Sequence, residues 1–311
     1  MRGSRSGFGR LWFVVAAGAA LLCLGSACRR DVPAAADSSP DVEHADSLPS
    51  PAPGAPLPTL AATTDGRTAL ERASQAYRTL RSYQCASVAD VKLRSGRSSS
   101  QYRQQSLLRF RREPDQIMLL VRDSGSGTTA FYADGATLTQ YSGLNNAYVR
   151  GDLTGSLAAL SRGIEYYGPQ VLSPIMFLQP ALVRAGTTSV RYDGPDTVEG
   201  KPTIRVRGKF TVPYLARLGS LTPYAGGMKP GRSEFTLWLD AGTYVMRKSH
   251  FRASWIGTTR DARSRETYTN PTIEATERVV EGIPNPALAA GLFRFVPPAG
   301  AQQRFLERPQ Q

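Results

Sequence analysis

The sequence predicts an α+β domain with a mostly antiparallel sheet over residues 67–311. Three observations lead to this class: an amphipathic helix opens the domain, segments with the two-residue period of strands follow it, and a helical insert separates them from a second group of strands. Asp-Gly and Ala-Gly pairs lie between neighbouring strand segments, which is typical of the short turns of antiparallel sheets. The predicted order is therefore helix, sheet, helical insert, sheet.

The opening helix is predicted over residues 68–83. Its apolar residues recur at helical spacing from Leu70 to Leu80, and its arginines lie on the other side. Thr68 and Glu71 have the spacing of a capping box, in which each side chain bonds a free backbone N–H of the first turn. We therefore expect the helix to begin at this pair.

Strand periodicity continues in segments that Gly, Ser, Asn or Pro interrupt. Asp134-Gly135 supplies the turn residues of one hairpin, and Asn145-Asn146 is expected to turn the chain again. The insert at 153–183 should form short helical pieces, because apolar residues share a helical stripe in its first half and prolines limit its second half. The expected strand segments are 83–94, 101–112, 115–123, 128–141 (a hairpin), 187–194, 203–210, 234–240, 243–254 and 273–282.

The segment from Ile117 to Val121 is apolar at every position, so both faces of its strand should be covered, one by the opening helix and the other by the insert. A sheet with helices over its open side encloses an apolar cavity that suits an acyl chain or lipid. The alternative is plain core packing without a cavity, which is the commoner meaning of such a run. The residues expected to contact a hydrophobic ligand are Ile117, Leu119, Val121, Leu157, Leu160, Ile175, Met176 and Leu178.

The N-terminal residues predict export. Three arginines precede the apolar run 11–24, which is shorter than the ~20 residues of a membrane-spanning helix and fits the core of a secretory signal. The sequence Gly25-Ser26-Ala27-Cys28 resembles the lipobox of bacterial lipoproteins, although Gly25 stands where that family prefers Leu. We expect residues 1–27 to be a signal peptide and Cys28 to be lipidated. Ordinary cleavage after Ala27 and an uncleaved anchor are the alternatives.

Residues 28–66 are expected to form the lipidated Cys and a disordered tether. Seven of the 22 prolines fall between Pro33 and Pro58, and no apolar period is present. Because Arg29 follows Cys28 where Asp would favour the inner membrane of enteric bacteria, the resemblance implies a bacterial envelope protein on the periplasmic side, anchored in the outer membrane. The net charge of +13 divides into +3 on residues 1–27, −4 on the tether and +14 on residues 67–311.

Six segments carry a further resemblance that spans about residues 67–300. Together they are similar to a family of periplasmic domains of unknown function in the lipoprotein-carrier superfamily, which includes the LolA carrier, its lipid-anchored receptor LolB and the amino-terminal domain of RseB. The resemblance implies an open antiparallel half-barrel sheet with helices covering its concave side, which binds acyl chains without chemistry. A tethered, lipidated chain resembles the receptor more than the carrier. The segments are 76–84, 110–121, 131–148, 153–183, 236–248 and 293–298.

Residues for chemistry are scarce. Two His and three Cys disfavour a zinc cluster, a haem site or a disulfide scaffold, and no nucleophile elbow or H-E-x-x-H motif is present. His250 is expected on a polar strand face shared with Met246, Lys248 and Arg252, without an identifiable carboxylate partner. We expect no enzyme activity, no cofactor and no metal. The aspartates expected to serve turns are Asp134, Asp152 and Asp240.

The function expected from these features is that of a non-enzymatic cell-envelope lipoprotein that binds an acyl chain or other hydrophobic ligand, with a role in lipid or lipoprotein trafficking. The alternative is a periplasmic protein-interaction or envelope-stress-sensing module without lipid transfer. A hydrolase that uses acidic residues near the cavity is a third reading. Expected partners are a lipid or acyl chain, the membrane through the anchor, and an anionic headgroup or periplasmic protein at the basic surface. Nucleic acid is not expected, because no binding motif is present and the chain is exported.

Overall fold

The computed structural model describes residues 62–124, 127–152, 174–220, 225–260 and 266–304. The predicted signal peptide, Cys28, nearly all of the tether, Leu157 and Leu160 lie outside these ranges, so they stay predictions. Among the described residues, no helix is long and apolar enough to cross a membrane.

The first described helix, α2 (Gly66–Thr79), begins two residues before the expected start and ends four residues before the expected end. Asp65 caps it, because its Oδ2 atom accepts hydrogen bonds from the Thr68 backbone N–H at 2.7 Å and from the Thr68 hydroxyl at 2.5 Å. The expectation that Thr68 begins the helix is therefore wrong: Asp65 already satisfies the free donor of Thr68. Gly66 is required by packing, since a Cβ atom there would lie 2.3 Å from the backbone of Arg191.

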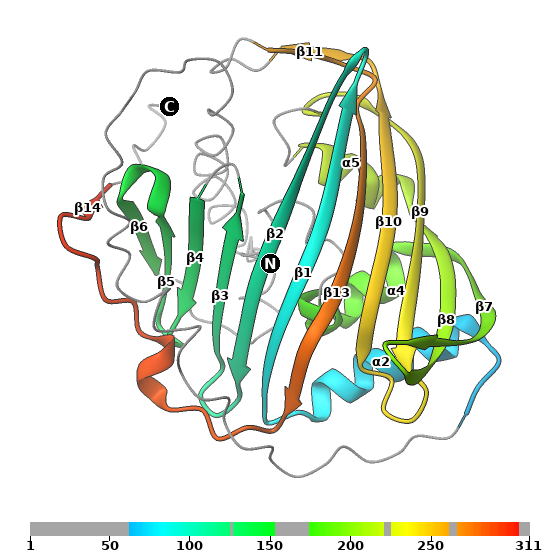
Figure 1. Ribbon diagram of the computed structural model, residues 1–311, viewed down its shortest axis with the longest axis horizontal. Coiled ribbons are helices and arrows are strands. Elements are labelled where there is room, and N and C mark those ends of the chain that lie inside the picture. The colour runs from blue at the N-terminus through cyan, green and yellow to red at the C-terminus, as the bar shows by residue number, and fades with distance from the viewer. Residues whose placement is uncertain (1–61, 125–126, 153–173, 221–224, 261–265, 305–311) are drawn as a thin grey trace, which may run out of the picture.

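The described residues form one sheet of 12 strands, in which all neighbours are antiparallel except β14 and β6. Its two edge strands do not pair with each other, so the sheet is open (Figure 1). A separate hairpin joins β11 (Thr258–Arg260) and β12 (Thr267–Thr269). In spatial order the strands are β14 (Gln302–Gln303), β6 (Ala147–Asp152), β5 (Thr137–Ser142), β4 (Gly127–Ala133), β3 (Gln116–Asp123), β2 (Ser98–Arg111), β1 (Ser82–Ser95), β13 (Thr272–Pro284), β10 (Met246–Ile256), β9 (Lys229–Asp240), β8 (Lys201–Phe210) and β7 (Thr187–Val198).

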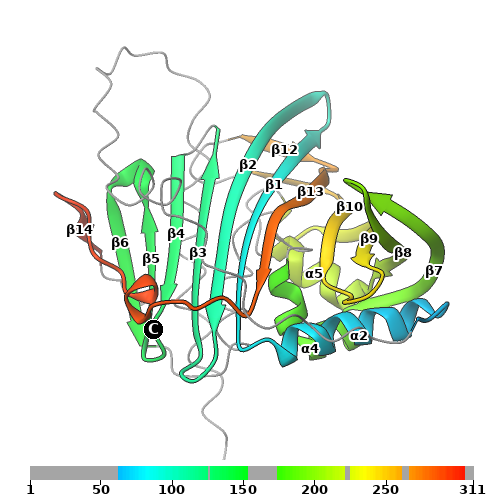
Figure 2. The same ribbon diagram turned by 60° about the horizontal axis from the view of Figure 1, so that its bottom comes forward.

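These strands confirm the predicted antiparallel segments, including the hairpin β4–β5, whose turn contains Asp134-Gly135. The second half of the insert forms the short helices η5 (Pro174–Leu178) and α4 (Pro180–Ala185), as its prolines predicted. The sequence reading did not include helix α5 (Val212–Ser220). Figures 1 and 2 show α2, α4 and α5 gathered beside β7–β10, at one end of the sheet.

One face of the sheet packs against the helices, and we call it the inner face. On β3 it carries Ile117, Leu119 and Val121, which belong to the same core cluster as residues of α2, η5 and α5. Two contacts tie the helices to each other and to the sheet. The Tyr77 ring of α2 stacks on Phe177 of η5 with centroids 5.2 Å apart, and Trp255 Nε1 of β10 donates to the Leu215 carbonyl of α5 at 3.1 Å.

The opposite, outer face of β3 carries Met118 and Leu120, and the C-terminal segment covers this part of the sheet. Phe295, which follows the short helix η6 (Ala290–Phe293), packs in a second apolar cluster that includes Leu120. Figure 2 shows this segment running across the strands before β14 joins the edge at β6. For the second half of the insert, the expectation that helix and insert cover opposite faces of β3 is wrong: α2 and η5 both belong to the inner cluster, where their apolar residues pack against each other. The first half of the insert lies outside the described residues.

Candidate ligand-binding site

The structure brings six of the eight predicted ligand contacts into one apolar cluster. Three come from the inner face of β3 and three from η5, and each is at most 6% exposed. The other two, Leu157 and Leu160, lie outside the described residues. Contact of these residues with a ligand stays a prediction. The six are Ile117, Leu119, Val121, Ile175, Met176 and Leu178.

A row of polar side chains interrupts the inner face on four neighbouring strands. Ser106 of β2 lies directly opposite Ser87 of β1, and Ser249 of β10 lies directly opposite Glu277 of β13. The Ser87 and Ser106 hydroxyl oxygens are 2.6 Å apart, and Ser87 Oγ donates to Glu277 Oε1 at 2.5 Å, which links the two pairs. We call Ser106, Ser87, Glu277 and Ser249 the polar row.

Glu277 is the ionisable member of the polar row and is only 7% exposed. Burial raises the pKa of its carboxyl group to about 7, even though the hydrogen bond from Ser87 lowers that pKa. Within the described part of the chain, no ion pair compensates its charge. The carboxyl group therefore keeps its proton to a higher pH than an exposed Glu does, and it can donate a hydrogen bond when protonated and accept one when ionised.

The prediction of purely apolar ligand contacts missed this row, although the sequence contains a signal for it. The inner residues of β13 alternate with outer ones, and Ile273, Ala275 and Val279 are buried on the inner side. Glu277 stands in the same phase of that alternation, where the pattern calls for an apolar residue. A Glu at a position that the strand alternation predicts to be buried is therefore the sequence signal that indicates the polar row.

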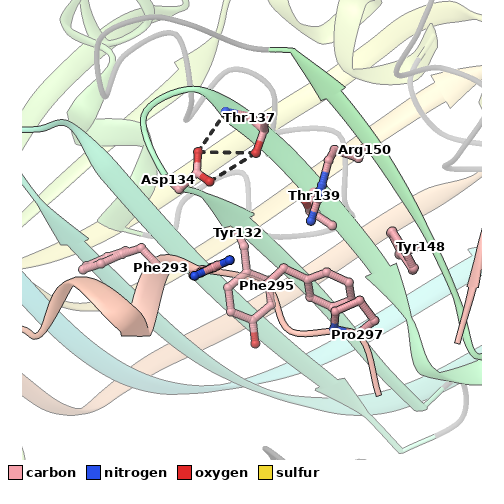
Figure 3. Close-up of a pocket in the computed structure, with 10 residues that line it drawn as sticks. Tyr132, Asp134, Thr137, Thr139, Tyr148, Arg150, Phe293, Phe295 and Pro297 are labelled. Carbon is pink, nitrogen blue, oxygen red and sulfur yellow. Dashed lines mark hydrogen bonds between the residues drawn. The ribbon is translucent and has the colours of Figure 1, made fainter. Parts of the chain in front are cut away.

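A pocket lies on the outer face of β4–β6 beside the C-terminal segment (Figure 3). Its volume is about 380 Å³. The Phe295 ring contacts Tyr132 and Tyr148, with centroids 5.5 and 5.0 Å apart. Two guanidinium groups and one carboxylate give the pocket a positive balance, so it suits a polar or anionic group better than an acyl chain. The lining residues are Tyr132, Asp134, Thr137, Thr139, Tyr148, Arg150, Phe293, Arg294, Phe295 and Pro297.

Two of the three predicted turn aspartates have the predicted role. Asp134 accepts hydrogen bonds from the backbone N–H groups of Ala136 and Thr137 at 3.0 and 2.9 Å. Burial alone would raise the pKa of Asp134, but these hydrogen bonds hold it below its ordinary value. Asp240 likewise accepts a hydrogen bond from the Thr243 backbone N–H at 2.9 Å. The side chain of Asp152 is not among those that the structure describes. Turn hydrogen bonds thus occupy both described carboxylates.

His250 lies on the outer face, as predicted, with its Nδ1 atom 3.0 Å from the Thr276 hydroxyl oxygen. The prediction that Met246 shares this face is wrong: Met246 is fully buried in the core cluster. The reason is a register shift between Met246 and Lys248, which reverses the side-chain alternation at the start of β10. Within the described ranges, no group of three or more potential metal-ligating side chains is present.

The chain matches no protein-family model and no curated protein. Similar solved structures include the lipoprotein LppX of Mycobacterium tuberculosis, at 14% identity and a TM-score of 0.36, over 72% of this chain and 97% of that chain. A LolA superfamily protein from Nitrosomonas europaea is similar at 12% identity and a TM-score of 0.27, over 75% and 99%. MucB of Pseudomonas aeruginosa, in its complex with MucA, is similar at 15% identity and a TM-score of 0.34, over 74% and 61%. A member of the LolA superfamily, which the sequence resembles, is thus among these similar structures.

Proposed function

We propose that the chain is a non-enzymatic lipoprotein of the bacterial cell envelope that binds an acyl chain or another hydrophobic ligand at the inner face of its sheet, in lipid or lipoprotein trafficking. The observation that supports this most is the apolar cluster on one face of an open sheet, which extends from β4 to β8 and includes residues of α2, η5 and α5. In this proposal the helices cover the concave side of the sheet, and the ligand lies between the two layers.

The energetic requirement for such binding is modest. Each buried CH₂ group of an acyl chain contributes about 0.8 kcal/mol. About ten such groups therefore supply ~8 kcal/mol, which corresponds to a dissociation constant on the order of 1 μM. An apolar surface such as the one that the β3 and η5 side chains form is sufficient for binding of this strength, and no catalytic group is needed.

Native mass spectrometry of the purified full chain tests this function directly, because a bound lipid adds its own mass to the protein. Displacement of an apolar fluorescent probe then locates the site. Val121→Trp fills the inner face and should weaken probe binding by at least about tenfold, whereas Arg122→Trp, one residue further on the same strand, places the same ring on the outer face and should leave it unchanged. Absence of both lipid and probe binding would refute the proposed function.

Anchoring at the membrane is the second part of the proposal, and it rests on the sequence around Cys28. Acylation at this residue supplies more than one chain, and stable membrane attachment needs at least two such signals. Cys28→Ser should abolish lipid modification and release the protein from the membrane fraction, while Cys23→Ser should change neither. Membrane association that is unchanged in Cys28→Ser contradicts the anchor.

The alternative function is a periplasmic protein-interaction or envelope-stress-sensing module. The outer-face pocket favours it, because this pocket has a positive balance of charge, is lined with aromatic rings and lies away from the apolar cluster. The two functions differ in what the chain retains on purification: a lipid in the first case, and no lipid in the second.

A further inference from the structure

The geometry points to a polar subsite inside the inner face: the polar row receives the uncharged polar group of an amphiphile, an ester carbonyl or a hydroxyl, whose acyl chain lies on the neighbouring apolar residues. This inference rests on the proposed function and names its ligand class. The ligand is a neutral acyl ester or acylated alcohol, and free fatty acids are disfavoured.

The polar row lies beside a predicted ligand contact. Ser106, at one end of the row, lies directly opposite Val121 of β3, which is a predicted ligand contact. Ser249, at the other end, lies directly opposite the fully buried Leu237 of β9. The row is therefore flanked by apolar residues on both sides. An acyl chain that reaches Val121 brings its polar end within one strand of the row, because neighbouring strands are about 5 Å apart.

The polar row leaves one carboxyl oxygen of Glu277 available to a ligand. Among the described residues, Glu277 has one hydrogen-bond partner, Ser87, which occupies Oε1. Its other oxygen, Oε2, is left to donate to an ester carbonyl when the carboxyl group is protonated and to accept from a hydroxyl when it is ionised. A simple core would place an apolar residue here, as its neighbours Ala275 and Val279 show, because a buried carboxyl group with one neutral partner is costly.

The charge of the polar row favours a neutral ligand. The row contains one carboxyl group and three hydroxyl groups, so it has no cation to bind a fatty-acid carboxylate. The carboxylate of a free fatty acid would lie beside Glu277, and each negative charge would disfavour the other in a buried setting. A neutral ester carries no such penalty. The row therefore discriminates between ligands with the same acyl chain by the charge of the polar group.

The test uses the full chain and measures displacement of an apolar fluorescent probe by 1-monooleoylglycerol and by oleate, at about pH 8, where Glu277 is mostly ionised. The wild-type chain should bind the glycerol ester at least about tenfold more tightly than oleate. Glu277→Gln removes the charge and keeps the shape and a hydrogen-bond donor. It should raise the affinity for oleate about tenfold and change the affinity for the ester less than about threefold. Glu274→Gln, on the outer face of the same strand, should behave as wild type.

The outcomes separate the subsite from the proposed function. If the probe binds and both oleoyl ligands displace it equally well, or if Glu277→Gln keeps the wild-type preference, the subsite is refuted and hydrophobic binding stands. If no apolar ligand binds wild type, Glu277→Gln or Glu274→Gln, the proposed function is refuted and the subsite with it. Thermal unfolding of the three proteins confirms that each is folded before binding is compared.

Discussion

Glu277→Gln should remove a large part of the pH dependence of the stability of this chain. The pKa of the Glu277 carboxyl is raised to about 7 in the folded protein, above its ordinary value of 4.5, because burial disfavours the charged form. The folded chain therefore binds this proton more tightly than the unfolded chain does. The resulting contribution to the free energy of unfolding is complete below about pH 4.5, declines as the pH rises towards about 7, and is lost above that value.

The magnitude follows from the size of the shift. One pKa unit corresponds to about 1.4 kcal/mol, so a rise from 4.5 to about 7 amounts to about 3 kcal/mol. This is a substantial fraction of the 5–15 kcal/mol that is typical of a folded domain. Wild type should lose about 3 kcal/mol through this group between about pH 4.5 and pH 8, whereas Glu277→Gln has no proton to lose there.

Urea unfolding of both proteins, followed by the fluorescence of Trp238 and Trp255, measures this difference at several pH values between about 5 and 8. Glu274→Gln serves as the control, since its side chain belongs to the outer phase of the same strand and should leave the pH dependence of wild type unchanged. Parallel pH profiles for wild type and Glu277→Gln would refute the reasoning. They would mean that the Glu277 carboxyl is hydrated in the folded chain and that the polar row is not part of a buried wall.

Three further changes test the packing. Gly208→Ala should lower the free energy of unfolding by about 1–3 kcal/mol, because its Cβ atom would lie 2.5 Å from the buried Phe235 ring. Gly151→Ala is the control: no atom lies within 4 Å of its Cβ position, so the free energy of unfolding should change by less than about 0.5 kcal/mol. Equal urea midpoints for the two variants would contradict this. Burial raises the pKa of the Cys85 thiol, so a thiol reagent should modify Cys85 only after unfolding. If the reagent modifies more thiols in folded wild type than in folded Cys85→Ser, this expectation is wrong. Asp65→Ala should lower the melting temperature and Asp65→Asn should largely preserve it, since Asn also caps helices; equal losses would argue against a capping role.

Local patterns predicted most of the sheet, because a strand's period and its turn residues are written within a few neighbouring positions. The hairpin β4–β5 is an example, since Asp134 both ends one strand and bonds the backbone that starts the next. Helix α5 was missed because contacts far along the chain support it. Its Leu215 carbonyl accepts from Trp255 Nε1, and a Cβ atom at Gly219 would lie 2.4 Å from that same nitrogen. A short helix that begins Val-Pro and ends Gly-Ser carries little local signal of its own.

The candidate site shows the same division. The burial of its apolar residues on β3 and η5 could be predicted, since unbroken apolar runs are visible in the sequence. The part that the C-terminal segment plays in covering the outer face could not be predicted, because Phe295 lies about 175 residues after Leu120 of β3. Only the folded chain shows which of several apolar segments reaches which face.

The two covers of β3 have different consequences for ligand entry. The strand is held by hydrogen bonds to β2 and β4, and its outer face lies under the C-terminal segment, so the sheet side of the site is fixed. By contrast, α2 and η5 meet the sheet through side chains, and they are joined to each other by the Tyr77–Phe177 stack and by a hydrogen bond from Ser74 Oγ to the Phe177 carbonyl. In the proposed function, α2 and η5 therefore respond to a ligand as one unit. This unit is also tied to the sheet, because Arg67 of α2 donates to the Thr187 carbonyl and the Met246 backbone N–H donates to the Tyr77 hydroxyl.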